Sequence, residues 1–238
     1  MSQIEYSPGL EGVIAGVTAI SHVDAENRRL IYRGYNVHDL AERSTYEEVA
    51  YLLLMGKLPA QRELDSFTRK LVAYRSLPSL FFDIFAKISS TVHPMDTLRT
   101  AVSVLALDDP DVAVNTHEAN LEKAIRLTAR IPTIIAAAHR IANKKAPIAP
   151  DLSLSHAEDF LYMLNGWRPD SFAAKVFDAS LIIYAEHGYN ASTFAARVTA
   201  STLSDIYSAV VAAIGALKGP LHGGANEQAM AMLREIGD

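Results

Sequence analysis

Cysteine is absent from the 238-residue chain. Its absence excludes disulfides, thiolate nucleophiles and thiolate metal sites, and it fits a reducing compartment, so we expect a cytoplasmic protein. Basic blocks are missing too, since 22 Lys and Arg residues are spread along a chain that has 27 Asp and Glu, which gives a formal net charge of -5. Without a basic stretch to follow a phosphate backbone, the chain is not expected to bind nucleic acid.

Long apolar segments are also lacking. The apolar run from residue 206 to residue 217 is 12 residues long, whereas a helix needs about 20 to cross a bilayer, so we expect a buried helix there. Residues 1–9 carry no basic region followed by an apolar stretch, and a secretory signal is therefore not expected. Because 50% of the residues are apolar, the chain is expected to be globular. Since no apolar run is long enough to span a bilayer, it is not expected to be a membrane protein.

The best-known catalytic motifs do not occur. The sequence has no G-x-x-x-x-G-K-[ST] or G-x-G-x-x-G cradle for phosphates and no G-x-S-x-G elbow for a serine hydrolase. It also has no H-E-x-x-H and no histidine pair at helical i, i+4 spacing beside a carboxylate. We therefore expect neither a metal site nor a bound cofactor.

Hydrophobic periodicity predicts a mainly α, multi-helical fold with a short N-terminal β-hairpin. The hairpin is expected within residues 13–33, with its turn at 24–27. Thr45 and Glu48 form a capping-box pair ahead of an apolar run that Gly56 ends. Further helices are expected at about 64–74, 80–88, 95–107, 119–142, 156–165, 171–185, 191–203 and 205–217. The last two are rich in alanine, so we expect them at the centre of a bundle or at a subunit interface.

Two of the eight histidines stand apart from the rest. Six lie among charged or turn residues and are expected on the surface, at positions 22, 38, 93, 117, 139 and 156. His187 and His222 instead lie at breaks between predicted helices, where binding and catalytic residues commonly occur.

The segment around His222 is suited to a developing negative charge. Gly223 and Gly224 have no side chains to keep a ligand away, and a helix expected to begin at Ala225 or Asn226 offers unpaired N–H groups. An imidazole in this place is suited to stabilising an enolate. The alternative is a turn that needs two glycines and carries an incidental histidine.

His187 follows Glu186 at the predicted end of a helix, where backbone carbonyls favour a positively charged imidazolium. Asn190 is expected to cap the next helix. A cationic histidine there suits a carboxylate or oxo ligand. The alternative is helix capping without a ligand.

Five motifs give the chain a family resemblance along its whole length. The motifs are Gly9-Leu10-Glu11-Gly12-Val13, Tyr32-Arg33-Gly34-Tyr35, His93-Pro94-Met95-Asp96, Asn190-Ala191-Ser192-Thr193-Phe194 and Gly219-Pro220-Leu221-His222-Gly223-Gly224-Ala225-Asn226. With these motifs the chain resembles citrate synthases, most closely the bacterial group that includes the 2-methylcitrate synthases.

The resemblance implies an acyltransferase that condenses acetyl-CoA or propionyl-CoA with oxaloacetate, giving citrate or 2-methylcitrate. In such enzymes an Asp removes the α-proton of the thioester, and the histidine matching His222 hydrogen-bonds the thioester oxygen. The histidine matching His187 binds oxaloacetate, with Asn190 alongside. Coenzyme A thioester is then a substrate, and no cofactor is implied. Arg75 is a further candidate for a substrate carboxylate contact, the alternative being an exposed arginine that ends a helix.

The resemblance also implies a homodimer with a large and a small domain in each subunit. Residues 1–238 match an incomplete large domain, and we expect the small domain and the C-terminal segment, with the catalytic Asp and carboxylate-binding arginines, to be missing. This chain alone is then expected to be inactive. Gly188 and Tyr189 between the two ligand residues favour the 2-methylcitrate group, and hence propionyl-CoA. The rival hypothesis is a non-catalytic helical scaffold that dimerises through its alanine-rich helices.

Overall fold

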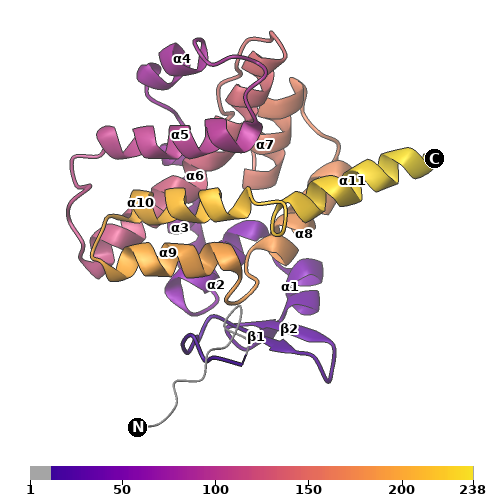
Figure 1. Ribbon diagram of the computed structural model, residues 1–238. Helices are drawn as coiled ribbons and strands as arrows, with labels where there is room; N and C mark the ends of the chain where they lie inside the picture. The colour runs from indigo at the N-terminus through magenta and orange to yellow at the C-terminus, as the bar shows by residue number, and fades with distance from the viewer. Residues whose placement is uncertain (1–11, 238) are drawn as a thin grey trace.

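The computed structural model describes residues 12–237. The mainly helical fold is confirmed: packed helices form the body, a small sheet lies at one end, and the last helix projects from the body (Figure 1). The helices are α1 (Val37–Arg43), α2 (Tyr46–Met55), α3 (Gln61–Tyr74), α4 (Ser79–Phe85), α5 (Pro94–Leu107), α6 (His117–Ala142), α7 (His156–Asn165), α8 (Ser171–Tyr184), α9 (Ala191–Ser201), α10 (Ile206–Leu217) and α11 (Gly224–Ile236). Residues 9–11 of the first motif, and residues 1–9 from which no signal is expected, lie outside the described residues.

The expected hairpin is confirmed and is extended by a third strand. β1 (Ser21–Asp24) pairs antiparallel with β2 (Arg29–Tyr32), with Ser21 opposite Tyr32. Arg33 and Gly34 then turn the chain in the left-handed region, at φ 50° and 94°, into the two-residue β3 (Tyr35–Asn36). Sequence periodicity missed β3 because two residues carry no alternation.

Helix α2 begins and ends at the residues that the local capping pattern predicts. The Thr45 hydroxyl accepts from the Glu48 N–H, and the Glu48 carboxylate accepts from the Thr45 N–H, so the expected capping box is confirmed. Gly56 ends α2 in the left-handed conformation, at φ 83°. The seven-residue α1, capped by Asn36, was not predicted, since a helix so short shows little periodicity.

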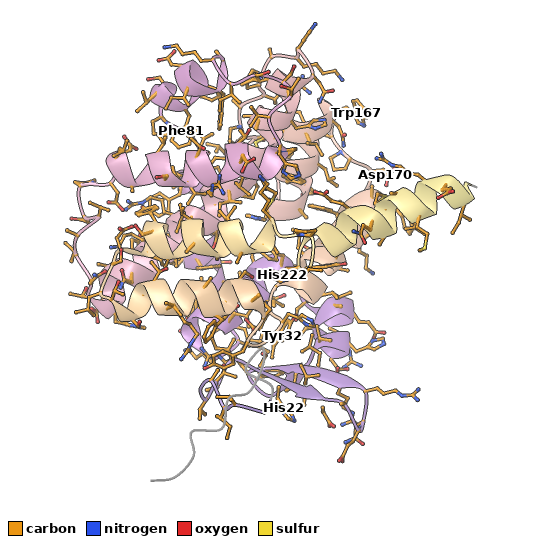
Figure 2. The ribbon with its side chains drawn as sticks, in the orientation of Figure 1. His22, Tyr32, Phe81, Trp167, Asp170 and His222 are labelled. Atoms are coloured by element: carbon orange, nitrogen blue, oxygen red, sulfur yellow. The ribbon has the colours of Figure 1, made fainter. Side chains whose placement is uncertain are left out.

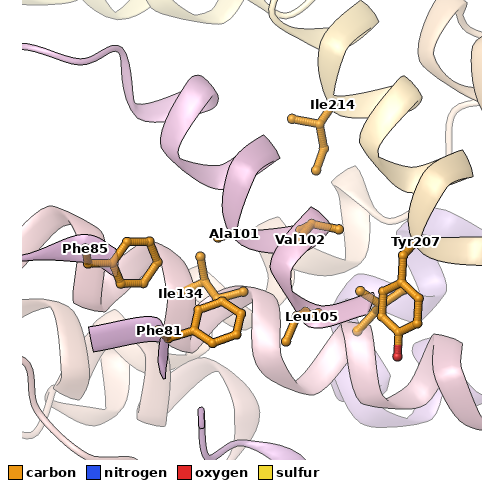
Figure 3. Packing of buried hydrophobic residues seen from close by; sticks show 9 residues of the cluster. Phe81, Phe85, Ala101, Val102, Leu105, Ile134, Tyr207 and Ile214 are labelled. Atoms are coloured by element: carbon orange, nitrogen blue, oxygen red, sulfur yellow. The ribbon is translucent and has the colours of Figure 1, made fainter. Parts of the chain in front are cut away.

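The largest hydrophobic cluster joins helices α4, α5, α6 and α10 (Figure 3). Its buried side chains come from three successive helices and from α10 near the end of the chain: Phe81, Phe85, Ala101, Val102, Leu105, Leu127, Ile134, Tyr207 and Ile214. Two smaller clusters lie under α2 and α3 and between β2, α1, α2 and α8. α5 is therefore held firmly in the core, which matters below because its first turn reaches the candidate site.

The alanine-rich helices behave differently from each other. α10 packs against both α5 and α9 and buries Tyr207, Ala209 and Ile214. α9 packs on α10, but none of its residues is fully buried in this part of the chain. The expected buried helix is thus found at α10, whereas α9 lies at the surface. No helix within residues 12–237 has the length and apolarity required to cross a membrane.

His156 corrects the expectation that six of the histidines decorate the surface. It is the first residue of α7, it is only 5% exposed, and its ring packs against Tyr46 with the centroids 4.7 Å apart. Burial, with Arg75 nearby, lowers the pKa of His156 from 6.5 to about 4. Charged neighbours in the sequence suggested exposure, but packing of α7 against α2 decides burial.

Replacing His156 with Phe is expected to change how stability depends on pH. Between pH 4 and 6.5 the unfolded chain binds a proton at this histidine and the folded chain does not, so this residue makes stability fall as pH drops. His156→Phe keeps an aromatic ring against Tyr46 and removes this pH-dependent contribution to stability. The loss of unfolding free energy between pH 7 and pH 4 should shrink by about 2–4 kcal/mol, measured by urea denaturation.

The matched control is His117→Phe, because His117 is also the first residue of a helix but is exposed. Asp178 acts in the opposite direction, since burial raises the pKa of its carboxyl to about 6 and its contribution is lost as pH rises from 4 to 6. An unchanged pH profile in His156→Phe would show that the buried imidazole does not govern acid stability.

Candidate functional site

The segment after α8 is held in place by Tyr32, whose side chain is completely buried. Its hydroxyl lies 2.9 Å from the Ile183 carbonyl and 2.8 Å from the Glu186 carbonyl, to which it donates, and it accepts from the Glu186 N–H at 3.3 Å. One tyrosine of β2 thus fixes the path of the chain as it leaves α8, immediately before His187.

The carboxylate of Glu186 stabilises the turn that presents His187. It accepts from the Ser21 hydroxyl at 2.9 Å and from the Gly188 N–H at 2.5 Å. Gly188 adopts φ 69°, in the left-handed region that favours glycine. The acidic side chain therefore faces β1, while the side chain of His187 is exposed to solvent.

Tyr189 ties the same turn to the segment before β1. Its hydroxyl donates to the Val17 carbonyl at 2.9 Å, and the Arg197 guanidinium lies 4.7 Å from the centre of its ring. A Cβ on Gly16 would come within 2.8 Å of the Tyr189 hydroxyl, so the two segments are in close contact. The turn carrying His187 is braced from both the sheet side and α9.

Asn190 caps α9, as expected. Its side-chain oxygen accepts from the Thr193 N–H at 2.8 Å and from the Ser192 hydroxyl at 2.7 Å. These bonds satisfy the start of the helix and fix the amide orientation, with its oxygen toward the helix. The prediction from the N-cap pattern is therefore confirmed in geometry.

His222 meets the N-terminus of α9 through Ser192, with its Nε2 atom 3.0 Å from the Ser192 hydroxyl oxygen. In Figure 2, His222 lies where α10 ends, in the middle of the molecule. The hydroxyl has a single hydrogen for two partners. When it points to Asn190, Nε2 of His222 must be the donor, and when it points to His222, the imidazole hydrogen resides on Nδ1. Ser192 thus couples the tautomer of His222 to the cap of α9.

Gly223, the residue after His222, is required by the turn. A Cβ on Gly223 would come within 2.3 Å of the Leu217 carbonyl oxygen, and the Gly223 N–H donates to that same oxygen at 2.9 Å. α11 begins at Gly224, so the expected start at Ala225 or Asn226 was one or two residues late. The group that approaches Gly223 so closely is the backbone carbonyl of Leu217, not a ligand.

Arg75 lies in a different part of the fold. It is the C-cap of α3 and is 2% exposed, with its Nη1 atom donating to the carbonyls of Leu154 at 2.9 Å and Asp151 at 3.2 Å. The same atom lies 3.3 Å from Oδ2 of Asp159. The alternative of an exposed arginine was therefore wrong. These contacts occupy the guanidinium within the α3–α7 interface, and the structure does not bring Arg75 together with His187, Asn190 or His222.

In the candidate site His187 is exposed, whereas Asn190, Ser192 and His222 are partly buried. Two apolar cavities, of about 420 and 620 Å³, lie between the helices, but neither has His187 or His222 in its wall. Among residues 12–237, no three His, Asp or Glu side chains gather as metal ligands would. The site consists of His187, Asn190, Ser192 and His222 around the start of α9.

Ser192, Tyr32 and Glu186 were missed as site residues. Ser192 has a local signal, because a Ser two residues after an N-cap Asn can reach its side chain. Tyr32 lies 154 residues from Glu186 in sequence, so no local pattern could have identified that contact.

Comparison with known proteins gives a consistent result. The family model described as the citrate synthase C-terminal domain matches residues 9–238. A citrate synthase of Haloferax volcanii is 46% identical over 98% of this chain and 63% of its own length. A 2-methylcitrate synthase of Mycobacterium tuberculosis is 49% identical over 97% of this chain and 58% of its own length.

Solved structures agree with the sequence matches. The citrate synthase of Pyrobaculum aerophilum superimposes with a TM-score of 0.91 at 42% identity, over 97% of this chain and 60% of that one. The citrate synthase of Thermoplasma acidophilum, in a ternary complex with carboxymethyl coenzyme A and oxaloacetate, gives 0.92 at 32% identity, over 98% and 61%. The chain thus spans about 60% of the length of these proteins.

Proposed function

The chain belongs to the citrate synthase family, and we propose that His187 and His222 serve the condensation of an acyl-CoA with oxaloacetate. The observation that supports this most strongly is the hydrogen-bond chain from His222 through Ser192 to Asn190, which joins the two motifs at one helix terminus. The relatives include both citrate synthases and 2-methylcitrate synthases, so the proposal includes both acetyl-CoA and propionyl-CoA as the thioester.

In the proposed reaction, His222 stabilises the enolate formed from the thioester. Deprotonation beside a thioester is slow unless a preorganised donor meets the developing oxyanion. In this proposal the Ser192 hydroxyl turns from Asn190 to Nε2 of His222, so that the imidazole hydrogen resides on Nδ1 and is available to that oxygen. The general base that removes the α-proton in this reaction is a carboxylate, and none of the site residues His187, Asn190, Ser192 and His222 supplies it.

His187 is the proposed ligand for oxaloacetate. It is exposed, it precedes the capped start of α9, and the unpaired N–H groups of a helix N-terminus favour an anionic ligand. The coenzyme A thioester is a substrate in this proposal, and no cofactor is involved. Inactivity of this chain alone, a preference for propionyl-CoA, a homodimer and a cytoplasmic location all stay predictions.

A helical scaffold is the second candidate. The exposed α9 and the exposed apolar side chains of α11, which include Met230 and Leu233, would be its association surfaces. A scaffold needs no ligand, so ligand dependence separates the two proposals.

Oxaloacetate is expected to raise the melting temperature of the chain. At ten times its Kd, a ligand that binds only the folded state contributes about 1.4 kcal/mol, or roughly 3–6 °C for a protein of this size. His187→Ala should abolish the shift, whereas His222→Ala should retain it. His22→Ala, at an exposed histidine of β1, is the control. A shift that is absent, or that survives His187→Ala, would contradict the assigned oxaloacetate site.

A further inference from the structure

The motif His93-Pro94-Met95-Asp96 has no part in the site described so far. It forms the N-cap and first turn of α5, at the end of a helix whose Ala101, Val102 and Leu105 are buried in the core. We propose that this first turn positions His222 by holding both ends of the segment 218–227. The inference rests on the proposed function for its catalytic meaning, but its contacts stand independently of it.

Asp96 holds the beginning of that segment. Its Oδ2 atom lies 2.6 Å from Nζ of Lys218, the C-cap of α10. Its Oδ1 atom lies 2.9 Å from Nη2 of Arg99, one turn further along α5. The lysine thus joins α5 by a hydrogen bond to the chain four residues before His222, whereas the arginine lies beside the same carboxylate without a hydrogen bond to it.

His93 faces the other end of the segment. Its Nδ1 accepts from the Met95 N–H at 3.2 Å, which caps α5 and leaves the ring hydrogen on Nε2. That Nε2 lies 3.6 Å from Oε1 of Glu227, in the first turn of α11. One helix end therefore contacts the residues on both sides of His222.

The segment between these two anchors is internally bonded. The His222 N–H donates to the Gly219 carbonyl at 2.9 Å, the Gly223 N–H to Leu217 at 2.9 Å and the Gly224 N–H to Gly219 at 3.3 Å. A turn closed in this way moves as one unit, so the contacts at its two ends set its orientation. The hydrogen bond between Nε2 of His222 and the Ser192 hydroxyl depends on that orientation.

The ion pairs of Asp96 are too exposed to stabilise the fold much. The side chains of Asp96 and Lys218 are 27% and 36% exposed, and such pairs contribute little to global stability. Their expected effect is local, on the population of turns in which His222 meets Ser192. Asp96, Lys218, His93 and Glu227 are thus positioning residues, since they act through His222.

The test replaces Lys218 with Met and follows His222 directly by NMR of the 238-residue chain. Amide hydrogen exchange at His222 and Gly223 should become about two- to fivefold faster. The ¹⁵N shifts of the His222 ring should move toward the tautomer mixture of free imidazole, while the melting temperature stays unchanged. Lys218→Arg should restore both readouts, because it keeps the pair with Asp96.

Lys70→Met is the matched control, since Lys70 makes a similar surface pair, at 2.7 Å, with Glu122. Asp96→Asn removes the charge from the other side and serves if Lys218→Met does not fold. Unchanged exchange and ring shifts in both variants, or equal changes in Lys70→Met, would overturn the inference. Neither readout needs substrate. A chain that shows the effect but binds no oxaloacetate would therefore refute the proposed function and support the positioning of His222 by the first turn of α5.

Discussion

Replacing Arg75 with Leu is expected to lower the unfolding free energy by about 3–5 kcal/mol, because it leaves the buried carboxylate of Asp159 without its partner. Both side chains are 2% exposed. Burial lowers the pKa of Arg75 and raises that of Asp159, which means that desolvation is the largest influence on each charge. Urea denaturation of the variant and the wild type at pH 7 measures the difference.

A double variant separates the cost of leaving one buried charge without its partner from the cost of losing the two side chains. Arg75→Leu with Asp159→Leu removes both charges and should recover part of the loss, because the cost comes mainly from the uncompensated charge. Arg69→Leu, at an exposed arginine on the same helix, is the control and should change stability by less than about 0.5 kcal/mol. Equal effects of Arg75→Leu and Arg69→Leu would contradict a structural role for the buried pair.

The second large effect concerns turnover in a longer, chimeric chain. A chimera would add the part of the Mycobacterium tuberculosis 2-methylcitrate synthase that this chain does not match, since the match covers 58% of that relative's length. In an active chimera, His222→Ala is expected to lower kcat by about 10²–10³-fold, the usual cost of removing one donor to a developing oxyanion. Ser192→Ala should lower kcat less, because the imidazole remains but loses the partner that sets its tautomer.

The companion variants assign the roles. His187→Ala should mainly raise KM for oxaloacetate, and His22→Ala should leave both kcat and KM unchanged. Both thioesters are assayed, because one methylene is worth only about 1–3 kcal/mol and preference must be judged from the ratio of kcat/KM values. Full activity in His222→Ala would contradict the assigned role even if the family assignment holds. A strong preference for acetyl-CoA would contradict the expectation drawn from Gly188 and Tyr189.

Helix positions and site positions were predictable to different degrees. The capping box at Thr45, the cap at Asn190 and the breaks at His187 and His222 depend on residues within four positions of one another, and the structure has all of them where they were expected. The exposure of His156 was predicted wrongly, because the charged residues beside it say nothing about which helix packs over it.

By itself, the sequence determined the helical composition of this chain, the caps that start its helices, the two histidines at helix breaks and the family. Those features rest on neighbouring residues and on motifs that are read along the chain. Only the tertiary structure decided that Ser192 meets His222, that Arg75 is buried against Asp159, and that the first turn of α5 reaches both sides of His222. The Lys218–Asp96 contact joins residues 122 positions apart. Such contacts follow from how α5, α9 and α10 pack, and packing depends on the shape and burial of many side chains at once.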